Sequence, residues 1–134
     1  SLYAAFGSKE ELFRRSVARY LEGPGGYVRD ALAHPDGRTA IRTLLEETVA
    51  MLKHPRNPGG CLLVQAGLVC SAEAEWVKKE LAAMRRKGVE LIRERLERAR
   101  REGQCSEATD CDCYSRFVTA VMHGLAVQAT AGAT

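Results

Sequence analysis

The stretch SLYAAFGSKEELFRR, residues 1–15, decides how the rest of the chain is interpreted. Residues 8–11, SKEE, have the pattern of a capping box. In that motif the Ser8 hydroxyl accepts from the amide of Glu11, and the Glu11 carboxylate accepts from the amide of Ser8. A helix is therefore predicted to begin at residue 8. The apolar residues before Gly7 resemble the end of an earlier helix, and we expect that helix to begin upstream of residue 1.

The composition limits the classes of protein to consider. The chain has 134 residues, of which 46% are hydrophobic and 28% are charged, enough for one domain with a core. It contains neither an apolar run of about 18 residues, the length needed to span a bilayer, nor a signal-peptide pattern. The net charge of +3 is too small to indicate nucleic-acid binding by itself. Five cysteines, an odd number without a secretory signal, indicate reduced thiols and a cytoplasmic protein.

Apolar residues recur at intervals of three or four along most of the chain, which predicts an all-α fold without internal repeats. Clusters of Gly and Pro separate the predicted helices, and residues 27–34 look less regular. The apolar stretch CLLVQAGLVC is interpreted as a buried helix, because a single strand would have no partner. Asp36 and Asp110 are predicted helix caps, and Gly103 is a predicted stop. The main helices are expected at residues 8–22, 37–54, 73–102 and 112–130.

No catalytic pattern is present. The sequence lacks H-E-x-x-H, G-x-S-x-G and a glycine-rich phosphate loop after a strand. Cys105, Cys111 and Cys113 lack the paired C-x-x-C spacing of a structural zinc site, so neither a metal nor another cofactor is predicted. Cys61 is interpreted as a packing residue, although a reactive thiol at either place remains open. Trp76, Met84 and Met122 have the spacing of core residues, and His123 that of a core or interface histidine.

The opening stretch resembles the end of the DNA-binding domain in TetR-family transcriptional regulators, whose helix-turn-helix closes with a pattern like S-L/F-Y-x-x-F-x-S/T-K-E-x-L. Every fixed position of that pattern is matched: Ser1, Leu2, Tyr3, Phe6, Ser8, Lys9, Glu10 and Leu12. GGCLLVQAGL and GLAVQATAGAT resemble the sixth and eighth helices of the family. The resemblance implies an all-α TetR-like regulatory domain at residues 23–134. Residues 1–22 would be the end of the recognition helix and the connector helix of the DNA-binding domain. The chain would then be a fragment, lacking most of the helix-turn-helix and the family's final helix.

The resemblance also implies a function. The protein would be a repressor and not an enzyme, a cytoplasmic homodimer that a small hydrophobic or aromatic inducer releases from operator DNA. Lys9 lies in the first turn of a helix, where free amides favour a phosphate. In the family the matching lysine and tyrosine contact the DNA backbone, so Lys9 and Tyr3 would position the protein without reading bases.

Two further sites are implied by the family. The effector pocket would lie between the connector helix and the three helices around it. Its wall is expected to consist of Phe13, Val17, Tyr20, Leu45, Val49, Gln65, Met84 and Phe117. The dimer would form through the C-terminal helices, with Phe117, Val121, Gly124 and Leu125 as an apolar stripe.

Two alternatives to a ligand-responsive repressor remain open. One is a thiol- or metal-responsive sensor on the same scaffold, and the other is a helical interaction module without a ligand. Thiol reactivity would identify the first, and the lack of a cavity would favour the second. The sequence does not indicate the effector, the operator, the regulated genes, or whether the chain dimerises without the family's final helix.

Overall fold

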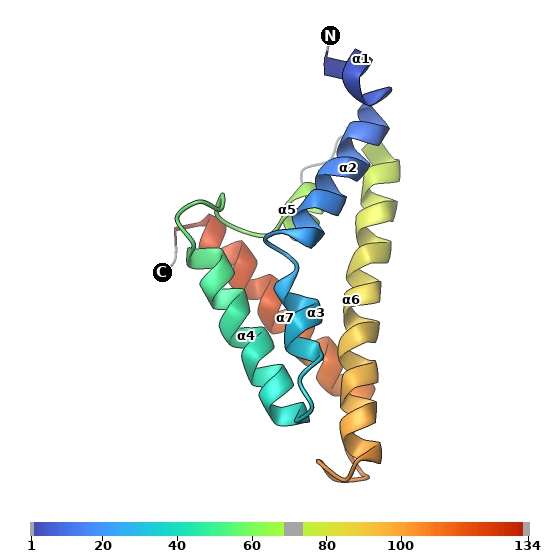
Figure 1. Cartoon of the computed structure of the whole chain (residues 1–134), viewed down its shortest axis with the longest axis vertical. Helices are drawn as coiled ribbons and strands as arrows, with labels where there is room; N and C mark the ends of the chain where they lie inside the picture. The colour runs from blue at the N-terminus through green and yellow to red at the C-terminus, as the bar shows by residue number, and fades with distance from the viewer. Residues whose placement is uncertain (1, 69–73, 133–134) are drawn as a thin grey trace.

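The structure, a computed structural model, describes residues 2–68 and 74–132, and over these ranges it consists of helices joined by turns and loops, without a strand (Figure 1). This confirms the all-α prediction. Residues 27–34, expected to be irregular, include a short helix. The helices are α1 (Leu2–Phe6), α2 (Lys9–Glu22), α3 (Tyr27–Leu32), α4 (Gly37–Lys53), α5 (Leu62–Leu68), α6 (Glu75–Arg101) and α7 (Cys111–Thr130). Within the described ranges, no helix is both long enough and apolar enough to cross a membrane.

The predicted helix caps form, with one difference. The Ser8 hydroxyl accepts from the amide of Glu11 at 3.1 Å, and Asp36 and Asp110 each accept from the amide three residues further on. The Glu11 carboxylate, however, accepts from Arg15 at 3.0 Å rather than from the amide of Ser8. Only half of the capping box is therefore present, because an arginine one turn later competes for the carboxylate.

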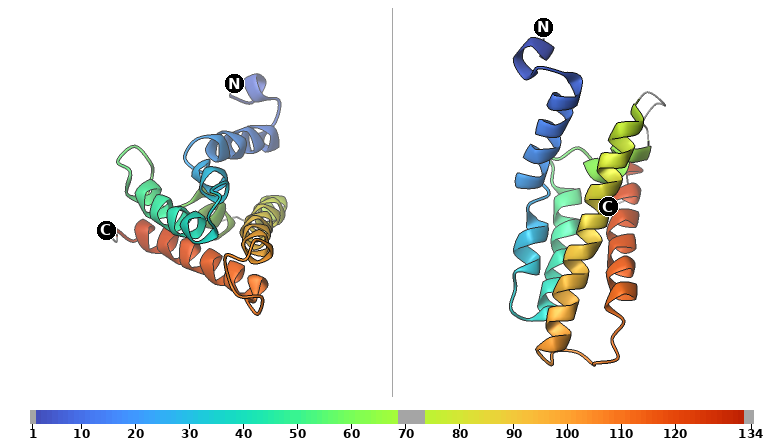
Figure 2. Two further views of the ribbon diagram at one scale, coloured as in Figure 1. Left: turned by 60° about the horizontal axis from the view of Figure 1, so that its bottom comes forward. Right: turned by 90° about the vertical axis from the view of Figure 1, so that its right-hand side faces the viewer.

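The helices pack around a core that four of them share. Ala31 of α3, Leu44 of α4, Ile92 of α6 and Val118 of α7 are all buried in one cluster. In two views α6 and α7 lie side by side, and α1 and α2 extend to one end of the molecule (Figures 1 and 2). After α6 the chain turns at Gly103, whose φ of +72° is a left-handed conformation that glycine adopts without strain.

Side chains from α6 hold the first half of α2. The rings of Phe13 and Trp76 are 5.5 Å apart and meet edge to face, and the Arg14 guanidinium lies 5.6 Å from the centre of the Trp76 ring. Arg14 also forms an ion pair with Glu80 at 2.6 Å. We call Phe13, Arg14, Trp76 and Glu80 the α2–α6 clamp. Beyond it, Val17 is 1% exposed, so α2 is attached to the bundle at two successive turns.

A buried arginine holds the opposite end of the bundle. Arg95 of α6 is 4% exposed and donates to the carbonyl of His34 at 2.8 Å and to that of Pro35 at 2.9 Å. Its Nη1 atom has no hydrogen-bond partner among the described residues. These bonds join α6 to the turn between α3 and α4.

Candidate functional site

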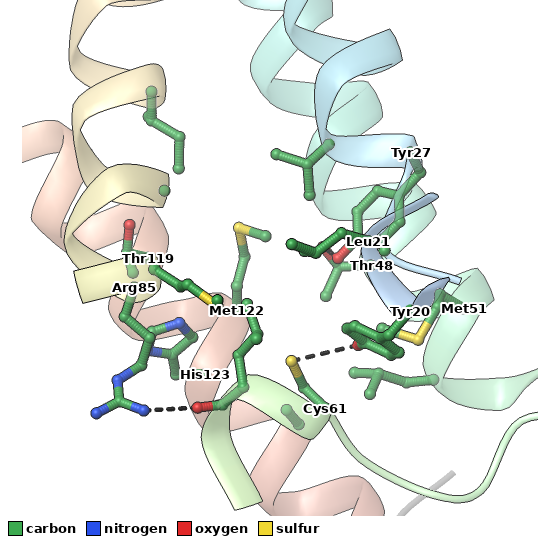
Figure 3. A pocket seen from close by; sticks show the side chains of 18 residues that line it. Tyr20, Leu21, Tyr27, Thr48, Met51, Cys61, Arg85, Thr119, Met122 and His123 are labelled. Atoms are coloured by element: carbon green, nitrogen blue, oxygen red, sulfur yellow. Dashed lines mark hydrogen bonds between the residues drawn. The ribbon is translucent and has the colours of Figure 1, made fainter. Parts of the chain in front are cut away.

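A cavity of about 100 Å³ lies between the end of α2 and helices α4, α6 and α7 (Figure 3). Most of its wall is apolar, as in sites that bind small hydrophobic molecules. The lining residues are Tyr20, Leu21, Gly25, Tyr27, Val28, Thr48, Met51, Leu52, Cys61, Leu63, Met84, Arg85, Gly88, Ile92, Thr119, Met122, His123 and Ala126.

Helical spacing explains why these residues face one space. On α7 the lining residues are Thr119, Met122, His123 and Ala126, at steps of three or four, which is the spacing of a single helix face. The lining residues of α6 follow the same rule. The wall toward α2 comes from its last turn, so the cavity touches the helix that leads to the N-terminal end of the chain.

The hydroxyl groups on one side of the cavity are engaged within the protein. The Tyr20 hydroxyl donates to the Cys61 sulfur at 3.3 Å, and those of Tyr27 and Thr48 are 3.0 Å apart. Burial raises the pKa of both tyrosines, and for Tyr20 the bond to Cys61 raises it further. Both phenols are therefore neutral at physiological pH.

The other side of the cavity carries a charge. Arg85 donates to the carbonyl of Leu63 at 2.6 Å, and His123 lies beside it (Figure 3). Burial lowers the pKa of His123, and the positive charge of Arg85 lowers it further. The imidazole is therefore neutral at pH 7, and this side of the cavity presents one cation and one polar ring.

The structure brings two of the eight expected pocket residues to the cavity wall, Tyr20 and Met84. Three others are internal packing residues. Val17 is buried, Phe13 contacts Trp76, and Leu45 packs against the core cluster.

The remaining three expected pocket residues lie elsewhere. Val49 and Phe117 are 41% and 63% exposed, because their neighbours Thr48 and Val118 take the inward positions on α4 and α7. Gln65 lines an adjacent depression that shares Tyr20 and Met51 with the cavity. Its amide donates to the hydroxyl of Thr130.

Several lining residues were not predicted. Met122 and His123, interpreted from the sequence as core or interface residues, face the cavity, and so does Cys61. A histidine within the apolar run VMHGLAV was a usable signal for such a site. Arg85 had no such signal in the sequence, because it is the first of three consecutive basic residues. Only the packing of α5 against α6 distinguishes Arg85 from Arg86.

The positions expected to contact DNA and a second subunit are at the surface where described. Lys9 is exposed in the first turn of α2, whereas the side chain of Tyr3 lies outside the described residues. On α7, Tyr114 is 54% exposed beside Phe117, and Val121, Gly124 and Leu125 are half-buried. A methyl group added at Gly124 would meet no atom within 4 Å, so this face of α7 is open.

The described cysteines differ in their exposure to solvent. Cys111 is buried, Cys105 is half-buried and Cys113 is exposed, while Cys70 lies outside the described residues. Across residues 2–68 and 74–132, the His, Cys, Asp and Glu side chains do not form a group of three or more that could hold a metal ion.

Comparison with known proteins identifies the family. A family model described as the tetracyclin repressor-like, C-terminal domain matches residues 37–132. An HTH-type transcriptional regulator of Bacillus subtilis (strain 168), YezE, is 26% identical over 120 residues. That match covers 88% of this chain but 62% of YezE, so the chain spans less than two thirds of this relative.

Solved structures agree with this assignment. A cysteine mutant of the TetR-family regulator CifR, complexed with a 26 bp operator DNA, is 42% identical with a TM-score of 0.93, covering 99% of this chain and 70% of that one. A TetR transcriptional regulator from Rhodococcus sp. RHA1 is 33% identical with a TM-score of 0.72, covering 99% and 71%. The resemblance of the opening motif, the helix order and these matches lead to one conclusion: the chain belongs to the TetR family of transcriptional regulators.

Proposed function

We propose that this chain contains the effector-binding and dimer-forming unit of a TetR-type repressor, and that a small hydrophobic molecule in the cavity releases the repressor from its operator. The observation that supports this proposal is the position of the cavity. Its wall is mainly apolar, and the last turn of α2 forms one side of it.

The cavity and the proposed DNA-binding end share α2. A ligand that presses on Tyr20 or Leu21 moves the C-terminal end of α2 relative to α4 and α6. In a dimer, such a movement changes the distance between two recognition helices, and a matched half-site spacing is a geometric condition for operator binding. We therefore assign residues 1–22 to the DNA-binding unit and residues 23–134 to the regulatory unit.

Two contacts with operator DNA belong to this proposal. The exposed Lys9 sits where the free amides of the first turn of α2 favour an anion, and it would bind a phosphate together with Tyr3. The matched CifR structure contains operator DNA, which supports operator DNA as the partner in this proposal.

The proposed dimer uses the open face of α7. Phe117, Val121, Gly124 and Leu125 lie along it, and Tyr114 extends the same stripe by one turn. The space above Gly124 would allow a second helix to approach closely.

The proposal is tested by filling the cavity. Ala126 is 2% exposed and lines it, so Ala126→Leu should occupy the ligand's space, whereas Ala50→Leu adds the same atoms at an exposed position of α4 outside the cavity. A panel of small hydrophobic compounds should raise the melting temperature of the wild type and of Ala50→Leu but not of Ala126→Leu. The same compounds should release operator DNA from a protein with a complete helix-turn-helix. If no compound stabilises the wild type, the ligand-sensor proposal fails.

A thiol sensor is the second candidate, and one observation favours it. Cys61 lies on the cavity wall with a hydroxyl donor on its sulfur, so a hydrophobic electrophile in the cavity would meet a thiol. Mass spectrometry after brief treatment with N-ethylmaleimide tests this candidate. Modification of Cys61 before the exposed Cys113 would support it, and the reverse order would contradict it.

A further inference from the structure

We infer that the effector is an amphipathic anion, whose apolar body fills the cavity and whose carboxylate binds Arg85 and His123. This inference rests on the proposed function, because it names the chemistry of the ligand of the same cavity. It is carried by the distribution of charge and of hydrogen-bond donors around the wall.

Arg85 is the one fully charged side chain among the lining residues, and the lining includes no Asp or Glu. No ion pair of Arg85 is found in the part of the chain that the structure describes. The bond to Leu63 uses one of its N–H groups, and a guanidinium has five. A methyl group added at Gly67 would lie 2.8 Å from Nη1 of Arg85, so α5 packs closely against the guanidinium and holds it in place. The cavity therefore has a fixed positive charge without a described counter-ion.

The hydroxyl groups of the wall already donate within the protein. Tyr20 donates to Cys61, and Thr119 donates to the carbonyl of Ser115. Thr48 donates to the carbonyl of Leu44, which leaves Tyr27 as the donor in the bond between Tyr27 and Thr48. Oxygen atoms of a ligand therefore find their free side-chain donors at Arg85 and at the neutral imidazole of His123.

A second hollow explains how an acid group would reach these donors. An open groove of about 430 Å³ runs along the outer side of α6 and α7, and it shares Arg85, Thr119 and His123 with the cavity. Its lining adds Arg86 and Arg116 and also includes no Asp or Glu, although Arg116 forms an ion pair with the neighbouring Asp112 at 2.9 Å. The shared residues thus lie between an apolar interior and a basic, solvent-facing groove. A molecule with an apolar tail inside and a carboxylate at this boundary satisfies both environments.

The experiment compares acids with their uncharged amides. Binding of hexanoate and hexanamide, and of phenylacetate and phenylacetamide, is measured by titration calorimetry on this 134-residue chain. The variant is Arg85→Gln, and the matched control is Arg101→Gln, which removes the same charge from an exposed position of α6 that lines neither the cavity nor the groove. Far-ultraviolet circular dichroism checks that each variant is folded.

We expect wild-type protein to bind each acid about tenfold or more tightly than its amide, the order of effect of a hydrogen bond between charged groups. Arg85→Gln should remove this preference, and Arg101→Gln should keep it. Amides that bind as tightly as acids would overturn the inference but leave the cavity proposal in place, and this comparison needs no variant to fold. Preserved acid preference in Arg85→Gln would also overturn it. If neither these probes nor any uncharged hydrophobic compound binds, both proposals fail.

Discussion

Replacing Trp76 by alanine should loosen α2 without unfolding the rest of the bundle. Trp76 is the common partner in the α2–α6 clamp, since Phe13 meets its edge and Arg14 lies over its face. An edge-to-face aromatic pair contributes about 0.5–1.5 kcal/mol beyond its buried area. A cation–π contact at an exposed site adds about 0.5–1 kcal/mol.

Together these contacts stabilise the attachment of α2 to the bundle by about 1–2.5 kcal/mol. Their loss corresponds to a roughly five- to seventyfold increase in the equilibrium constant for local opening of α2. The ion pair of Arg14 with Glu80 contributes less, because the two side chains are 53% and 29% exposed. Glu80→Gln should therefore change the opening of α2 by much less than Trp76→Ala. Trp76→Phe, which retains an aromatic ring, should have an intermediate effect.

The assay is amide hydrogen exchange followed by mass spectrometry on peptides from α2, α4 and α7. Local opening governs exchange in segments that detach without global unfolding. In Trp76→Ala, amides of α2 peptides should exchange roughly five to seventy times faster than in the wild type. The exchange rates of peptides from α4 and α7 should remain unchanged. Unchanged exchange in α2 would refute the role of Trp76 and show that other contacts, such as the buried Val17, hold the helix. Equal acceleration in all three helices would show that α2 and the bundle unfold as one unit.

Four further predictions follow from single contacts. Arg95→Met should destabilise the fold by about 2–4 kcal/mol in urea unfolding, because it removes the hydrogen bonds that a buried guanidinium donates to the carbonyls of His34 and Pro35. Exposed Arg98→Met should cost less than about 1 kcal/mol, and equal effects would contradict the role of burial. In a protein with a complete helix-turn-helix, Lys9→Ala should weaken binding to all DNA sequences and reduce the salt slope by about one unit, and a changed base preference would refute the phosphate contact. Leu125→Asp should shift sedimentation from dimer to monomer, and a tight dimer of this variant would place the interface elsewhere. The hydrogen bonds from Thr39 hold the pKa of Asp36 below its usual value. The stability that Asp36 contributes is therefore present above its unfolded pKa and is lost as the pH falls toward its folded pKa. Asp36→Asn should reduce this loss of stability when unfolding is measured from neutral to acid pH.

Features that depend on a few neighbouring residues could be predicted from the sequence. Ser8, Asp36 and Asp110 cap helices by accepting from an amide three residues away, so the chemistry lies within one turn. The stop at Gly103 is equally local, because only a glycine adopts its positive φ without strain. The same opening stretch carried the family motif, which indicated the fold before any packing was known.

The tertiary structure decided which side chains meet at the cavity. Adjacent residues of a helix point about 100° apart, so a small error in the expected orientation exchanges an inward residue for an exposed one. This happened at Val49, where Thr48 faces the cavity, and at Phe117, where Val118 faces the core. The role of Arg85 depends on a carbonyl of α5, 22 residues away in sequence, and no local pattern contains that contact.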